Sequence, residues 1–131
     1  MDADSWTVVT DKTPTKNQLD DLAFAWTAVK HVKSNAIVLA KDRQLVGMGS
    51  GQPNRLNSIH LAVRAAGNSS SGSVLASDAF FPFADNIEMA SQAGIVALIQ
   101  PGGSIRDEET IKSANELGLS MVFTHVRHFN H

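Results

Sequence analysis

Residues 73–86 of the chain read SVLASDAFFPFADN and contain a short apolar run, a carboxylate, several aromatic residues and a proline. The small and apolar residues 73–76 predict a buried strand. The proline and the clustered aromatics end that strand, because proline cannot take part in the ladder of a central strand. Asp85 or Asn86 then suits the N-cap of a helix over residues 87–93. The stretch therefore predicts a strand, a turn and a helix in succession.

The residues between this strand and this helix allow two interpretations. Asp78 and three phenylalanines, Phe80, Phe81 and Phe83, come just before the expected helix N-terminus, whose free N–H groups favour an anion or a polar ligand. An aromatic surface beside a carboxylate suits a flat heterocycle. Alternatively, all three phenylalanines pack in the core, the usual place of aromatic side chains. The sequence leaves both interpretations open.

Towards the C-terminus, strands and helices continue to alternate. The apolar run 95–99 predicts a strand, residues 104–117 begin with a capping box and predict a helix, and residues 119–123 predict a last strand. This alternation favours a mainly parallel sheet with helices on both faces. The histidine-rich tail, residues 124–131, follows the sheet edge where α/β proteins bind ligands. The alternative for the tail is a solvated terminus.

Towards the N-terminus, a helix and a hairpin are expected. Thr15 and Gln18 fit a capping box, and apolar residues follow at helical spacing, with Trp26 on the buried stripe. The β-prone run 36–40 and the run 45–48 are separated by a short polar turn, which predicts a β-hairpin.

A glycine-rich segment, residues 47–55, follows the hairpin. It matches a dinucleotide-binding loop poorly, because its third glycine comes one residue early and the acidic residue expected further along is absent. The glycines instead predict a sharp turn and a close approach of the backbone to another part of the molecule. Arg55, in the first turn of the next helix, is a candidate for holding an anion, and His60 is expected in the core. Asn35, at the start of a buried strand, either satisfies local backbone groups or belongs to a site.

Composition excludes several functional classes. A chain of 131 residues that is 43% hydrophobic and 18% charged fits one compact domain. The net charge of −2 and the pI near 6.2 do not suggest a nucleic-acid partner. The absence of cysteine excludes disulfides and a thiolate zinc site. The acidic N-terminus and the lack of a membrane-length apolar run lead us to expect a soluble, cytoplasmic protein without membrane contact.

Five motifs together resemble one enzyme family. They are residues 29–36 (VKHVKSNA), 49–55 (GSGQPNR), 77–86 (SDAFFPFADN), 100–104 (QPGGS) and 126–131 (VRHFNH). They are similar to the C-terminal part of the bifunctional AICAR transformylase/IMP cyclohydrolase family of purine biosynthesis. The resemblance implies a cytidine-deaminase-like, three-layer α/β domain with a mixed, mainly parallel sheet. It implies a single domain, residues 1–131, that corresponds to the second transformylase subdomain, without the first subdomain or the cyclohydrolase domain.

The resemblance also implies a reaction and a site. The family transfers a formyl group from 10-formyltetrahydrofolate to the amino group of AICAR during IMP synthesis. The residues that match the substrate site are Asn35, as an orienting residue, Arg55, Phe80 and Arg127. Those that match the folate side are Pro82, Phe83, Asp85 and Asn86. Ser34 and Asp78 match positions near a monovalent-cation site, with potassium as the expected ion, and the family forms homodimers.

The chain departs from the family at points that bear on its activity. Ala84 stands where the family frequently has arginine, and the catalytic Lys-His pair of the first transformylase subdomain has no counterpart here. We therefore expect the chain alone to lack catalysis and to need the remainder of the enzyme. A zinc-dependent deaminase is excluded by the absence of cysteine. The alternative function is a stand-alone, non-catalytic nucleotide- or folate-binding module.

Overall fold

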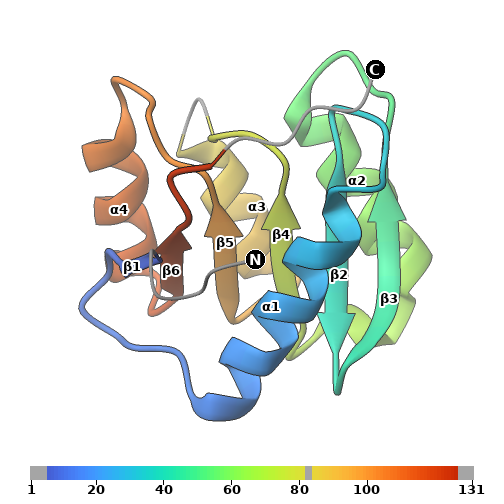
Figure 1. Ribbon diagram of the computed structural model, residues 1–131, viewed down its shortest axis with the longest axis horizontal. Coiled ribbons are helices and arrows are strands. Elements are labelled where there is room, and N and C mark those ends of the chain that lie inside the picture. Colours follow the sequence, from blue (N-terminus) through green and yellow to red (C-terminus); the bar gives the residue numbers. More distant parts are fainter. Residues whose placement is uncertain (1–5, 82–83, 127–131) are drawn as a thin grey trace.

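The computed structural model describes residues 6–81 and 84–126, which form a six-stranded sheet and four α-helices (Figure 1). The strands are β1 (Thr7–Val8), β2 (Ile37–Lys41), β3 (Gln44–Gly49), β4 (Val74–Ser77), β5 (Ala97–Gln100) and β6 (Ser120–Phe123). The helices are α1 (Lys16–Val29), α2 (Arg55–Ala66), α3 (Asp85–Gln92) and α4 (Asp107–Glu116), and a short 3-10 helix, η2 (Gly67–Ser70), follows α2. No helix within these ranges is long and apolar enough to cross a membrane.

The sheet is mixed, with the strand order β1-β6-β5-β4-β2-β3. Strands β4, β5 and β6 run parallel, and the pairs β1–β6, β2–β4 and β2–β3 are antiparallel. The predicted hairpin is confirmed: its turn residues Asp42 and Arg43 have φ values of 53° and 59°, as a tight hairpin turn of type I′ requires. Because Ile37 pairs with both Ser77 and Gly49, the start of β2 meets the ends of β3 and β4. We call this edge, which also holds the ends of β5 and β6, the upper edge, because it lies at the top of Figure 1.

Helices cover the two faces of the sheet unequally (Figure 1). Helix α1 alone packs on one face, where Leu22, Trp26 and Val29 join the core formed with the central strands. Helices α2, α3 and α4 cover the other face. The predicted capping box of α1 is confirmed, since the Thr15 hydroxyl accepts the Gln18 N–H at 3.1 Å and the Gln18 side chain accepts the Thr15 N–H at 2.9 Å. The arrangement is the predicted three-layer α/β domain.

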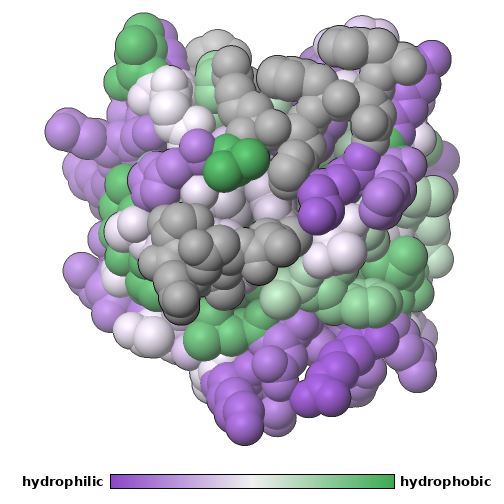
Figure 2. All heavy atoms as spheres, in the orientation of Figure 1, coloured by the Kyte–Doolittle hydropathy of each residue, from purple (hydrophilic) through white to green (hydrophobic). Residues whose placement is uncertain are grey.

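The face that carries α1 keeps apolar surface on both sides of the helix. On the side of β1 and β6, a pocket of about 340 Å³ is lined by Trp6, Val8, Leu19, Asp20, Ala23 and Val122. On the other side, Leu45 and Met48 of the edge strand β3 are half exposed. Figure 2 looks onto this face and shows apolar areas in green between the polar ones. A single helix therefore leaves more of its face open than three helices leave of theirs.

The glycine-rich segment brings β3 against α2. A Cβ on Gly47 would clash with the carbonyl of Ala62, and a Cβ on Gly49 with the carbonyl of Ser58. The predicted close backbone approach is therefore confirmed, and its partner is helix α2. The contact turns Ser58 and Ala62 inward and leaves His60 exposed, so the prediction of a buried His60 is wrong.

Two helices begin at residues other than those predicted. Helix α3 starts at Asp85, and its N-cap is Ala84, which makes no side-chain cap hydrogen bond, so neither Asp85 nor Asn86 is the N-cap. Helix α4 starts at Asp107 rather than at Ser104. The predicted capping contacts are nevertheless partly present, because the Asp107 carboxylate accepts the Ser104 N–H at 3.1 Å and the Ser104 hydroxyl accepts the Arg106 N–H at 3.0 Å. This acidic side chain fastens the preceding loop to the start of α4.

Candidate functional site

Most of the residues predicted to form a site lie in the loops of the upper edge. These loops are residues 31–36 before β2, 50–54 between β3 and α2, 78–81 after β4, 101–106 after β5 and 124–126 after β6. Open α/β sheets bind ligands at the carboxyl ends of their strands. The described residues of this edge form two neighbouring groups, one buried and polar, the other open and partly aromatic.

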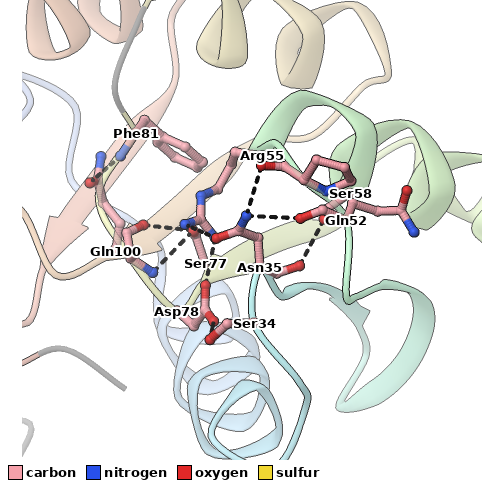
Figure 3. A network of polar contacts seen from close by, with 11 residues as sticks. Ser34, Asn35, Gln52, Arg55, Ser58, Ser77, Asp78, Phe81 and Gln100 are labelled. Atoms are coloured by element: carbon pink, nitrogen blue, oxygen red, sulfur yellow. Dashed lines mark hydrogen bonds and ion pairs between the residues drawn. The ribbon is translucent and has the colours of Figure 1, made fainter. Parts of the chain in front are cut away.

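The buried polar group consists of Ser34, Asn35, Arg55, Ser58 and Asp78 (Figure 3). Arg55 Nη1 pairs with Asp78 Oδ1 at 2.5 Å, and Arg55 Nη2 donates to Asn35 Oδ1 at 2.9 Å. The Ser34 hydroxyl donates to the second oxygen of Asp78 at 2.6 Å. The side chains of Arg55 and Asp78 are only 9% and 2% exposed. The group is therefore an internal ion pair with its hydrogen-bond partners in place.

Asn35 connects this group to the loop between β3 and α2. Its Nδ2 donates to the carbonyl of Gln52 at 2.9 Å, and its own carbonyl accepts the Ser58 hydroxyl at 2.7 Å. The peptide bond between Ser34 and Asn35 is cis. Asn35 thus satisfies backbone groups, as one of the two sequence interpretations holds, and it also contacts Arg55. Its amide is fixed on both sides by the protein itself.

Charge balance explains why Arg55 and Asp78 occur together. A cation in the first turn of a helix opposes the helix dipole, and an unpaired buried charge costs several kcal/mol. Asp78, which follows β4 directly, supplies the compensating charge. The anion that Arg55 contacts in the structure is therefore Asp78.

The same contacts bear on the expected potassium ion near Ser34 and Asp78. Both Asp78 oxygens have partners, and one partner is the positively charged Arg55. In the described ranges, no three His, Cys, Asp or Glu side chains lie close enough to hold a metal ion together. The potassium ion near these two residues stays a prediction.

The open group surrounds a pocket of about 340 Å³ lined by Phe80, Pro101, Gly102, Gly103 and His125. We call it the Phe80 pocket. Phe80 is partly exposed, whereas the adjacent Phe81 is 0% exposed and belongs to the core. Phe81 therefore packs in the core, as the second sequence interpretation expects, whereas Phe80 lines the pocket. The binding of a heterocycle there stays a prediction.

Gln100, at the end of β5, is a site residue that sequence reasoning missed. It is 0% exposed. Its Oε1 accepts the Phe81 N–H at 3.1 Å, and its Nε2 donates to the sulfur of Met121 at 3.3 Å. Gln100 thereby ties the loop that carries Phe80 to β5 and β6. The signal in the sequence was a polar residue at the end of an apolar strand, directly before Pro101.

His125 is a second residue that sequence reasoning did not single out, although the tail was a candidate as a whole. It lines the Phe80 pocket and has a φ of 65°. Its main-chain N–H donates to the carbonyl of Pro101 at 3.0 Å. The backbone of the β6 end is thus bound to the loop after β5.

The remaining predicted residues are only partly covered by the structure. Arg127, Pro82 and Phe83 lie outside the described residues. In the first turn of α3, Asp85 is exposed and Asn86 is 3% exposed. Asn35, Arg55 and Phe80 lie at the same edge of the sheet, Asn35 and Arg55 in the buried polar group and Phe80 in the neighbouring pocket. Their role in binding a substrate stays a prediction.

The sequence is similar to bifunctional enzymes of purine biosynthesis. A family model described as "AICARFT/IMPCHase bienzyme" matches residues 1–65. The bifunctional purine biosynthesis protein PurH of Oceanobacillus iheyensis is 57% identical over 124 residues, which are 95% of this chain and 24% of that protein. PurH of Prochlorococcus marinus is 58% identical over 128 residues, 98% of this chain and 25% of that protein. The chain thus spans about a quarter of the length of these curated relatives.

Two solved structures have a similar fold, and one of them is a dCMP deaminase. Acinetobacter baumannii RibD (form 1) has a TM-score of 0.56 and 18% identity, over 82% of this chain and 34% of that one. The dCMP deaminase of cyanophage S-TIM5 has a TM-score of 0.53 and 18% identity, over 84% of this chain and 98% of that one. At such identities the likeness concerns the fold alone. It confirms the predicted cytidine-deaminase-like architecture.

Proposed function

Because the chain belongs to the AICARFT/IMPCHase bienzyme family, we propose that it forms part of the AICAR formyltransferase site of such an enzyme. The observation that carries this proposal is the position of the Phe80 pocket. It lies at the carboxyl ends of the parallel strands, beside the buried polar group. Phe80 is partly exposed there. A shallow aromatic wall next to glycine peptides suits a flat heterocycle such as the imidazole of AICAR.

Each residue of the edge has a role in this proposal. Phe80 stacks on the imidazole ring of AICAR. Asn35 and Arg55 mainly support the site without contacting the ring, because their polar atoms bind one another and the loop before α2. Asp85 and Asn86, with Pro82 and Phe83, form the folate side, and Arg127 contacts the nucleotide. The remainder of the enzyme chain and a second copy of it supply the rest of the site.

The chemistry explains why the chain alone should not catalyse the transfer. The amine nitrogen of AICAR attacks the formyl carbon, the bond from that carbon to N10 of the folate breaks, and the amine proton passes to N10. A base for that proton and a donor for the developing oxyanion each contribute roughly 10²–10⁴-fold in rate. In the buried polar group, the only carboxylate is Asp78, which is already paired with Arg55, and no histidine of this chain matches the family's catalytic Lys-His pair. We therefore propose that this chain binds and orients substrate, and that the base comes from the remainder of the enzyme.

A formyl-transfer assay tests the proposal. The purified chain is mixed with AICAR and 10-formyltetrahydrofolate, tetrahydrofolate release is followed, and AICAR binding is measured by calorimetry. We expect binding without turnover, with full-length PurH of Oceanobacillus iheyensis as the active control. Turnover near that of the full-length enzyme would show that the chain needs no further residues. Absence of AICAR binding would contradict the proposed site, and binding of folate alone would favour the non-catalytic folate module.

A further inference from the structure

We propose that His125 is a substrate-contacting residue of the Phe80 pocket, which hydrogen-bonds the polar edge of the heterocycle that stacks on Phe80. The inference rests on the proposed function and adds a residue to it. Two independent observations lead to it: the backbone conformation of His125 and the orientation of its imidazole.

The backbone of His125 is in a conformation that is uncommon for residues other than glycine. Its φ of 65° lies in the left-handed region, which costs free energy for any residue with a Cβ. Among the described non-glycine residues, only Asp42 and Arg43 share a positive φ, and both sit in the β2–β3 turn that needs it. His125 is in no such turn. Glycine would fit its backbone with less strain, so the presence of a histidine needs a reason in its side chain.

Main-chain hydrogen bonds hold His125 in this conformation. The Thr124 N–H donates to the carbonyl of Gln100 at 2.9 Å, and the His125 N–H donates to the carbonyl of Pro101 at 3.0 Å. The Thr124 hydroxyl accepts the Val126 N–H at 3.2 Å. These hydrogen bonds therefore hold the backbone of His125 in the left-handed region, as is typical of strained residues at functional sites.

The imidazole of His125 is fixed at the wall of the pocket. Its Nε2 shares a hydrogen bond of 3.0 Å with the Thr7 hydroxyl, and its ring meets the Phe123 ring edge-on, with centroids 6.2 Å apart and an angle of 83°. Within the described part of the chain, Nδ1 makes no hydrogen bond. The ring is thus oriented by one nitrogen while the other stays available to a ligand.

These features define the ligand chemistry. The partly exposed Phe80 offers an aromatic face, and His125, which lines the same pocket, has one ring nitrogen without a hydrogen bond in the described part of the chain. A flat heteroaromatic ring with a donor or acceptor on its edge satisfies both. AICAR, with an amine and a carboxamide on an imidazole, belongs to this class. The competing explanation is a structural one, in which His125 merely fastens β1 to β6 through Thr7.

Substitution by glycine separates the two explanations. His125→Gly removes the imidazole and relieves the backbone, whereas His125→Asn keeps a polar side chain that tolerates the left-handed region. Asp42→Gly is the matched control, because it relieves the same kind of backbone strain in the β2–β3 turn, away from the pocket. AICAR affinity is measured by calorimetry and the melting temperature by circular dichroism for each variant.

We expect His125→Gly to bind AICAR about tenfold more weakly, as the loss of one directed hydrogen bond implies, with a melting temperature at or above that of the wild type. We expect His125→Asn to recover part of the affinity and Asp42→Gly to bind as the wild type does. Unchanged affinity in His125→Gly, together with weaker binding in Phe80→Ala, would overturn this inference and leave the proposed function intact. A lowered melting temperature without a loss of affinity would show the structural role. Absence of AICAR binding to the wild type would overturn both.

Discussion

The buried polar group and the Phe80 pocket lie at the same edge of one sheet, yet their polar atoms are used in opposite ways. In the polar group, Arg55 binds both Asp78 and Asn35, and the side chains of Arg55 and Asp78 are almost closed to solvent. In the pocket, Phe80 and His125 remain accessible. The comparison teaches that the strand ends differ in their use: one group holds the loops together, and the other, in our proposal, presents a ligand surface. Substitutions in the first group should change stability, and substitutions in the second should change binding.

The two adjacent phenylalanines offer the sharpest contrast. Phe81 is 0% exposed in the core, so Phe81→Ala should lower the free energy of unfolding by about 3–5 kcal/mol. Phe80 is partly exposed, so Phe80→Ala should lower it by clearly less. Urea denaturation followed by circular dichroism measures both. Equal losses of stability would mean that Phe80 is a core residue and that the pocket is not open.

The ion pair is the next test of the comparison. Asp78→Asn leaves Arg55 buried without a counter-charge and should destabilise the fold by about 3 kcal/mol. Asp20→Asn is the matched control, because it breaks the Arg43–Asp20 pair, whose side chains are 68% and 37% exposed, and should cost less than about 1 kcal/mol.

A double variant decides whether the loss comes from the unpaired charge. Arg55→Met combined with Asp78→Leu removes both charges, so it should be more stable than Asp78→Asn alone. If the double variant lost as much free energy of unfolding as the sum of the losses in Arg55→Met and Asp78→Leu, the two charges would not be coupled. Denaturation curves of the single and double variants supply the comparison.

Gln100 should show a smaller effect that links the two groups. Gln100→Met leaves the Phe81 N–H without its acceptor, which should cost about 1–3 kcal/mol and speed hydrogen exchange at that amide. Gln44→Met, on the exposed side of β3, is the control. Unchanged protection of the Phe81 amide would show that Gln100 does not hold the loop.

Elements with local signals could be predicted from the sequence. The capping box at Thr15, the β2–β3 hairpin and the close approach of Gly47 and Gly49 all depend on a few neighbouring residues, and all three are present. The strand and helix alternation likewise predicted the layered fold. The family motifs predicted which loops gather at the upper edge.

Features set by distant contacts could not be predicted in this way. His60 lies on an apolar stripe in the sequence, but the close contact with the glycines of β3 turns Ser58 and Ala62 inward and leaves His60 exposed. The pairing of Arg55 with Asp78 joins residues 23 positions apart, and the role of Gln100 depends on where the loop after β4 returns. Each of these was decided by tertiary packing, which no local pattern encodes.

The most direct test of the central claim is the affinity of AICAR for the wild type and for Phe80→Ala, measured by calorimetry. Phe24→Ala, which removes a ring that is 38% exposed on α1, is the control. We predict that Phe80→Ala weakens binding by about 1–3 kcal/mol, the usual value of an aromatic stack, and that Phe24→Ala leaves it unchanged. Equal affinities of the wild type and Phe80→Ala, or an equal loss in Phe24→Ala, would contradict the assignment of the Phe80 pocket as the AICAR site.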